Sequence, residues 1–97
     1  MSELIFHPEV SLEIKASFNW YEAQVEGLGS DFLSELESAY QAIEELPNTW
    51  PKFKTNFRRY LLSKFPYSVI YRPGPQGVFV LAVMHNHRNP GYWENRT

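Results

Sequence analysis

The sequence contains no cysteine, and this absence excludes several kinds of chemistry at once. The chain can form no disulfide, no thiolate nucleophile and no zinc–thiolate site, which is typical of proteins in a reducing compartment. It also lacks an apolar run near 18 residues and a basic, apolar leader, so neither a membrane span nor export is predicted. We therefore expect a cytoplasmic protein that does not bind membranes.

The first half of the chain has almost no basic residues, and the second half has almost no acidic ones. Residues 1–50 contain one base, Lys15, against ten acidic residues, and residues 51–97 contain one acid, Glu94, against eight bases. The net charge of −2 therefore conceals −9 in the first half and +7 in the second. This asymmetry predicts a positive surface that receives an anionic partner, opposite an acidic layer.

What the sequence does contain indicates a folded protein. Its 97 residues are 43% hydrophobic and 16% aromatic, which excludes wholesale disorder and is sufficient for a hydrophobic core. We predict a single domain over residues 1–97.

The first half of the chain predicts one strand and two helices. Leu4–His7 is a short apolar run that Pro8 ends, as expected of a strand. A helical stripe follows, formed by Val10, Ile14, Ser17, Phe18, Tyr21 and Val25. Residues 27–29, Gly-Leu-Gly, interrupt it, and Ser30 or Asp31 is the predicted N-cap of a second helix that Pro47 ends. Trp20 and Tyr21 are expected to pack within the helical layer.

The second half predicts three strands after a rigid loop at residues 47–51. The strands span residues 57–64, 67–72 and 78–85, and turn residues at 73–77 join the last two as a hairpin. The last strand is apolar on both faces, so it should be central and covered on each side. The predicted fold class is α+β with the order β-α-α-β-β-β, an N-terminal strand, an α-helical hairpin, a three-stranded antiparallel meander and a short C-terminal tail or helix.

Functional side-chain types are concentrated after the last strand. We consider four of them as catalytic candidates: His85, His87, Arg88 and Tyr92. The candidate partner-binding residues are mainly basic: Arg58, Arg59, Lys64, Arg72, Arg88, Trp93 and Arg96. Trp93 and Tyr92 are alternatively a hydrophobic lid that folds back over one face of the sheet.

The two histidines also admit a structural interpretation. His85 is expected to end the face formed by Phe79, Leu81 and Val83, as a hydrogen-bonded histidine at the edge of the core. His85 and His87 would share a face of a continued strand, as some metal ligands do. No carboxylate or third histidine lies near them in sequence, so we predict no metal and no cofactor.

Several of these residues make the sequence resemble the ParE/RelE superfamily of type II toxin–antitoxin toxins, also called plasmid stabilisation proteins. The resemblance lies in Trp20-Tyr21, in Gly27-Leu28-Gly29 with Phe32, in Phe65-Pro66-Tyr67 with Ile70-Tyr71, and in the closing pattern His85-x-x-Arg88-x-Pro90-x-Tyr92-Trp93-x-x-Arg96. It implies a RelE/ParE-like fold and a toxin that a small acidic antitoxin holds inactive, with a toxin dimer within a heterotetramer as one arrangement.

The superfamily divides into two chemistries. The resemblance implies either a ParE-like inhibitor of DNA gyrase, which is not an enzyme, or a RelE-like endoribonuclease that cleaves mRNA on the ribosome. The acidic overall balance, the nine Lys and Arg residues and the Tyr92-Trp93 pair favour the ParE-like interpretation. The ribonuclease remains the alternative, with His85, His87, Arg59, Arg72 and Tyr92 in its site.

Overall fold

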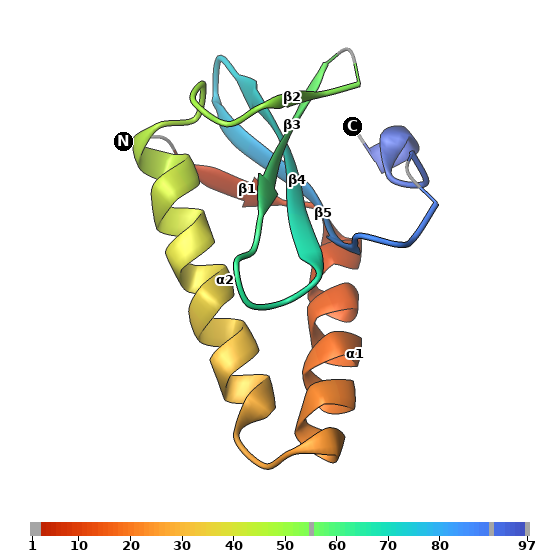
Figure 1. The fold of residues 1–97 in the computed structure, drawn as a ribbon. Helices are drawn as coiled ribbons and strands as arrows, with labels where there is room; N and C mark the ends of the chain where they lie inside the picture. Colours follow the sequence, from red (N-terminus) through yellow and green to blue (C-terminus); the bar gives the residue numbers. More distant parts are fainter. Residues whose placement is uncertain (1–2, 55, 90, 97) are drawn as a thin grey trace.

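A helical hairpin and a mixed sheet form two layers in the computed structural model, which describes residues 3–54, 56–89 and 91–96 (Figure 1). The elements follow the order β1 (Leu4–Phe6), α1 (Pro8–Gln24), α2 (Leu28–Glu45), β2 (Lys52–Phe53), β3 (Phe57–Leu61), β4 (Tyr67–Gly74), β5 (Gly77–His85) and a 3₁₀ turn, η1 (Glu94–Arg96). Neither helix in these described ranges is long and apolar enough to cross a bilayer. The predicted α+β class and element order are confirmed.

The sheet has the strand order β1-β5-β4-β3-β2. β3, β4 and β5 form the predicted antiparallel meander, whereas β1 pairs parallel with β5, so the sheet is mixed. β5 is central and buried on both faces, as its apolar sequence predicted. β2 was not predicted, because a two-residue strand has no recognisable alternation.

The turn between the helices differs from the prediction. α2 begins at Leu28 with Gly27 as its N-cap in the left-handed region (φ 88°), so neither Ser30 nor Asp31 is the cap. The Glu22 carboxylate accepts the N–H groups of Gly27 and Gly29, each at 2.9 Å, and so replaces a capping side chain. A Cβ at Gly29 would lie 2.7 Å from the Phe18 ring, so glycine is needed for the close approach of the helices.

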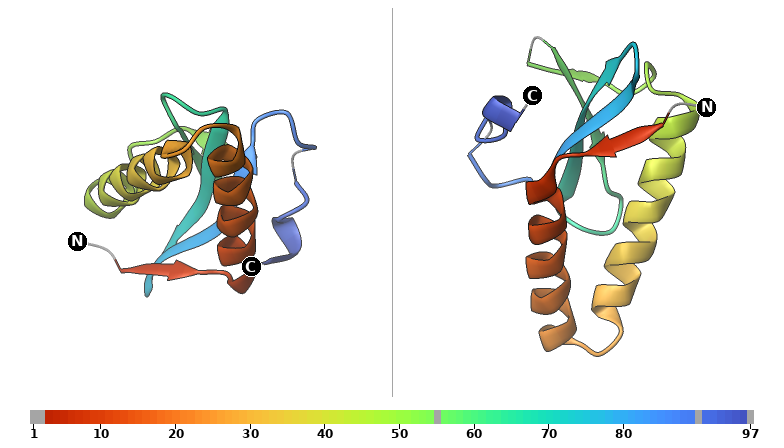
Figure 2. Two further views of the ribbon diagram at one scale, coloured as in Figure 1. Left: turned by 90° about the horizontal axis from the view of Figure 1, so that it is seen from below. Right: turned by 180° about the vertical axis from the view of Figure 1, so that it is seen from behind.

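Two hydrophobic clusters lie on opposite faces of the sheet. The larger cluster joins both helices to the sheet and includes Phe32, Leu36, Val69, Tyr71 and Val80. The smaller cluster occupies what we call the outer face, which consists of Phe57, Ile70, Leu81, Ala82 and Met84, with Trp93 packed on it. Figure 2 shows that the C-terminal residues and α2 lie on opposite sides of the sheet. The C-terminal residues therefore cover the face that α2 leaves open.

A register shift in β5 changes which residues share a face. Ile70 pairs with Ala82 and Tyr71 with Val80, so Leu81 is an extra residue in β5. Leu81 lies on the outer face, whereas Val83 belongs to the helical side. The expectation that Phe79, Leu81 and Val83 share one face is therefore wrong.

Two further expectations need correction. Trp20 does not pack inside the helical layer, because it is 60% exposed, although its neighbour Tyr21 is buried. The predicted strand over residues 57–64 ends at Leu61. The residues after it form a bend because the Glu35 carboxylate accepts the backbone N–H groups of Ser63 and Lys64.

Candidate functional site

The C-terminal segment, by which we mean the described part of residues 86–96, is held to the fold by the carboxylate of Glu13. Glu13 lies on α1, and its side chain is 12% exposed. It accepts hydrogen bonds from the Tyr92 hydroxyl at 2.7 Å and from Arg96 Nη1 at 3.0 Å, and Arg88 Nη1 lies 4.0 Å away. One helix carboxylate therefore gathers three of the candidate residues into what we call the Glu13 cluster.

The same cluster closes an open edge of β5. The pairing of β1 with β5 ends at Val80, which leaves the later backbone groups of β5 that face away from β4 without a strand partner. Glu13 accepts the N–H of Val83 at 3.0 Å, and Arg96 donates to the carbonyl of Leu81 at 2.9 Å. Two side chains thus satisfy backbone groups that a longer β1 would have paired.

Tyr92 is held in its protonated form within this cluster. Burial raises the pKa of Tyr92, and the hydrogen bond and negative charge of Glu13 raise it further, against the lowering effect of Arg88 and Arg96. Both guanidinium groups lie over its ring, with Arg88 Cζ 3.6 Å and Arg96 Cζ 5.0 Å from the centroid. The pKa of Tyr92 is therefore shifted further from neutral pH, where a tyrosine already carries its proton.

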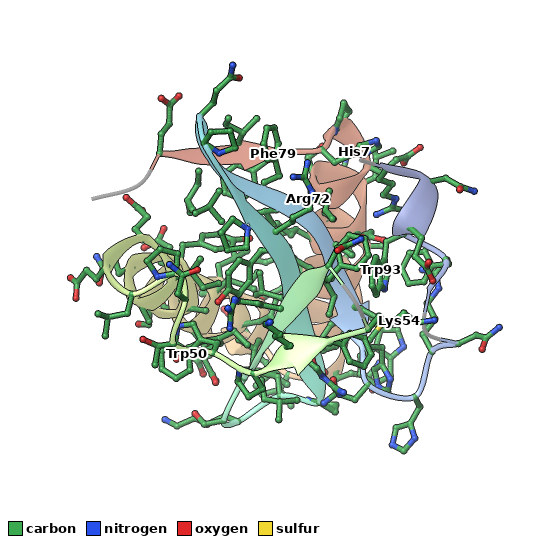
Figure 3. All side chains as sticks on the ribbon, turned by 90° about the horizontal axis from the view of Figure 1, so that it is seen from above. His7, Trp50, Lys54, Arg72, Phe79 and Trp93 are labelled. Atoms are coloured by element: carbon green, nitrogen blue, oxygen red, sulfur yellow. The ribbon has the colours of Figure 1, made fainter. Side chains whose placement is uncertain are left out.

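Trp93 is a core residue. It is fully buried and packs edge-on against Phe57, with ring centroids 4.5 Å apart. Figure 3 shows Trp93 on the opposite side of the sheet from Trp50. Its side chain is out of reach of a partner in this conformation, so the lid interpretation holds and a direct contact of Trp93 with a partner would require the segment to open.

The two histidines contact each other. The ring centroids of His85 and His87 are 5.4 Å apart, and His85 Nδ1 accepts the backbone N–H of His87 at 3.1 Å. His85 also packs edge-on against Tyr67, at 5.1 Å. Within the described ranges, no side-chain hydrogen bond or ring contact joins either histidine to Tyr92.

A second polar cluster lies beside the histidines. Arg59 Nε donates to the hydroxyl of the fully buried Ser68 at 2.9 Å, and Arg59 Nη2 donates to the side-chain oxygen of Asn86 at 3.3 Å. The guanidinium lies 4.9 Å from the centroid of the Phe53 ring. No carboxylate of the described chain lies within ion-pair distance of Arg59, so its charge is balanced only by neutral acceptors.

The basic residues do not form the single positive surface that the sequence predicted. Arg59 and Arg72 lie on the outer side of the sheet, and Arg72 stacks over Phe79 at 4.8 Å (Figure 3). Arg58 instead donates to the Trp50 carbonyl at 2.7 Å, and Lys64 lines a groove against α2. Their separation follows from strand alternation, which sends Arg58 and Arg59 to opposite faces.

Sequence reasoning missed the residues that organise both polar clusters, namely Glu13, Ser68 and Asn86. Glu13 lies three residues after Val10 and four before Ser17, both of which are buried. An acidic residue beside a buried helical stripe was the signal available for it. Ser68 and Asn86 had no comparable signal. Pro90, part of the closing pattern, lies outside the described residues.

No group of three or more potential metal ligands among His, Asp and Glu occurs in the residues that the structure describes.

Comparison with known proteins finds a family model and a solved structure that match this chain. The family model described as ParE toxin of type II toxin-antitoxin system, parDE, matches residues 4–90. A solved chain from the chromosomal ParDE TA system of P. aeruginosa is similar in fold, with a TM-score of 0.66 and 14% sequence identity, over 88% of this chain and 96% of that one. Comparison with curated protein sequences finds no match.

Proposed function

Because the chain belongs to the ParE toxin family of type II toxin–antitoxin systems, we propose that it inhibits DNA gyrase and that a cognate antitoxin neutralises it. The observation that carries this proposal is the family match over residues 4–90, which includes nearly every structural element described above. The toxin would act in the cytoplasm as a binding protein, without cleaving a substrate.

The chemistry of the C-terminal segment supports a binding role over a catalytic one. Cleavage of a phosphodiester needs a base for the 2′-hydroxyl, an acid for the leaving oxygen and cations for the developing charge. The Tyr92 hydroxyl, whose pKa is raised, donates a hydrogen bond to Glu13, and Arg96 is paired with the same carboxylate. These groups fix the segment on the sheet, which leaves them poorly placed to transfer protons.

A ribonuclease is the second candidate, and one arrangement favours it. His85 and His87 lie together, and Asn86 between them binds the guanidinium of Arg59. The two imidazoles could act as base and acid in cleavage of a phosphodiester. The neighbouring guanidinium, which has no acidic partner in the described chain, could bind the phosphate group. This alternative makes His85 and His87 essential, whereas the gyrase proposal does not.

Gyrase inhibition by the purified protein tests the proposal directly. We expect the wild-type chain to block gyrase supercoiling of relaxed plasmid, and the double variant H85A/H87A to block it to a similar extent. The same two proteins should leave mRNA intact in a translating extract. Failure of the folded wild type to inhibit gyrase at stoichiometric excess would remove gyrase as the target. Site-specific mRNA cleavage that H85A/H87A abolishes would establish the ribonuclease instead.

A further inference from the structure

Trp20 leaves most of its side chain in water on the outer side of α1. It is 60% exposed, and its ring contact in the described chain is with the buried Tyr21, at a centroid distance of 5.2 Å. Leu12 and Ala16 are also exposed, and they precede Trp20 at intervals of four residues. Residues four apart share a helix face, so Leu12, Ala16 and Trp20 form one apolar stripe, which we call the α1 stripe. Because its members are contiguous, the stripe is a candidate interaction surface.

A groove extends the α1 stripe toward the sheet. It has a volume of about 630 Å³, and its lining includes Ala16, Trp20, Tyr21, Pro66, Tyr67 and His85. Most of these side chains are aliphatic or aromatic. Ala16 and Trp20 belong to both the stripe and the groove, so the two form one continuous apolar surface. An exposed tryptophan at the centre of such a surface has the character of a binding hot spot, where an aromatic anchor enters a pocket of the partner.

Two hydrogen-bond donors of this surface are unused in the part of the chain that the structure describes. The Ser17 hydroxyl donates to the Tyr67 hydroxyl at 2.9 Å, which leaves the proton of Tyr67 free for another acceptor. The indole N–H of Trp20 also has no acceptor there. A donor that is buried without an acceptor costs free energy. A partner that covers this surface therefore presents oxygen acceptors at the edge of an apolar pocket.

Charge narrows the choice of partner. α1 contains three acids, Glu9, Glu13 and Glu22, against one base, Lys15. This helix repels a nucleic acid or an anionic membrane, and it repels the acidic antitoxin that the family resemblance implies. Two copies of the chain that met through α1 would oppose like charges. Of the partners in the proposed function, gyrase is the one that this surface does not disfavour.

We propose that Trp20 anchors the chain on gyrase, with the α1 stripe and the adjoining groove as the docking surface. This inference rests on the proposed function, because it takes gyrase as the target. The indole would enter an apolar pocket of gyrase, and carbonyl or carboxylate oxygens at the edge of that pocket would accept from Trp20 and Tyr67. His85 supplies one wall of the groove, so the variant H85A/H87A keeps the anchor.

Removal of the indole tests the anchor. Trp20→Ala shortens an exposed side chain and leaves the helix intact, because alanine has the highest helix propensity. We expect its half-inhibitory concentration for gyrase supercoiling to be about tenfold or more above that of the wild type. The control is Leu46→Ala, which removes a side chain that is 55% exposed just after α2, at the far end of the hairpin (Figure 1). This control should stay within about threefold of the wild type.

Obstruction of the groove provides a second test that leaves Trp20 in place. Ala16→Glu adds a long charged side chain at an exposed position that lines the groove. It should also raise the half-inhibitory concentration about tenfold or more, because the added side chain keeps the partner from the apolar surface. Gln41→Glu adds the same charge at an exposed position of α2 and should have little effect. Circular dichroism verifies that each variant is folded.

The possible outcomes separate the two proposals. The docking inference requires both Trp20→Ala and Ala16→Glu to lose inhibition while both controls keep it. If the wild type does not inhibit gyrase, the proposed function fails and the docking inference fails with it. If the wild type inhibits and either groove variant inhibits equally well, the docking inference is wrong while the proposed function stands. In that case, weaker binding of the variants to the protein encoded beside this chain would assign the surface to the antitoxin, and conversion of a dimer of the free chain into a monomer would assign it to a second copy.

Discussion

Glu13 carries more of the site than any other single residue. Its carboxylate accepts three hydrogen bonds, from the Tyr92 hydroxyl, from Arg96 and from the backbone N–H of Val83. These donors come from β5 and from the C-terminal segment, so the carboxylate joins both of them to α1 at one point. Because the Glu13 side chain is only 12% exposed, water could not readily replace its carboxylate as a hydrogen-bond acceptor.

We expect Glu13→Ala to lower the free energy of unfolding by about 3 kcal/mol, because it leaves the largely buried Arg96 guanidinium and the Val83 N–H without their acceptor. Glu13→Gln keeps the shape and one acceptor oxygen and should cost less. Urea denaturation measures both. The control is Glu9→Ala, which removes an exposed acid from the same helix and should cost about 0.5 kcal/mol. Equal losses for Glu13→Ala and Glu9→Ala would show that the Glu13 cluster does not stabilise the fold.

At the level of helices and strands, much of the architecture was predictable from the distribution of apolar residues along the chain. The apolar sequence of β5 indicated a central strand covered on both faces, and the structure confirms it. The lid interpretation of Trp93 also holds, because the outer face needs an apolar cover.

The remaining details depend on contacts between distant residues, which periodicity does not encode. The extra residue in β5, Leu81, follows from pairing with β4 and moves Val83 to the other face. Glu22 caps α2 from the preceding helix, so local capping rules pointed to the wrong residue. Glu13 illustrates the same limit in the site, because its donors lie about 70 residues or more away in sequence.

Tyr71 connects β4 to the loop between α2 and β2, and this connection should fail at alkaline pH. Its hydroxyl donates to the Pro47 carbonyl at 2.8 Å, and burial raises the pKa of Tyr71 to about 12 against the lowering effect of the Arg58 charge. In the unfolded chain the tyrosine loses its proton near pH 10, so the unfolded state binds fewer protons between pH 10 and 12. The stabilisation is therefore complete below pH 10 and is lost as the pH rises toward 12.

Tyr71→Phe tests this connection. The variant should be about 1 kcal/mol less stable at pH 7, because the Pro47 carbonyl loses its donor. Its stability should fall less steeply than that of the wild type between pH 10 and 12, as measured by denaturant titrations at several pH values. An unchanged slope would contradict the assignment of this pH dependence to Tyr71.

Across the whole molecule, acidic and basic residues are separated between different structural elements, but they do not form one acidic and one basic surface. The acids of residues 1–50 lie mainly on the two helices, whereas the bases lie on the strands, the loops and the C-terminal segment. Arg88 and Arg96 lie near Glu13, and Lys54 pairs with Glu94. No other base of the second half has a carboxylate within ion-pair distance in the described chain: these are Lys52, Arg58, Arg59, Lys64 and Arg72. A protein partner with a narrow acidic segment fits this distribution better than an extended nucleic acid does.

Pulsed expression of the wild-type chain without its antitoxin, followed by separate measurement of the DNA-damage response and of transcript integrity, tests the central claim most directly. If the chain is a gyrase-directed toxin, growth stops, the DNA-damage response is induced and transcripts remain intact. Transcripts cleaved without a DNA-damage response, or growth that continues unimpaired, would contradict it.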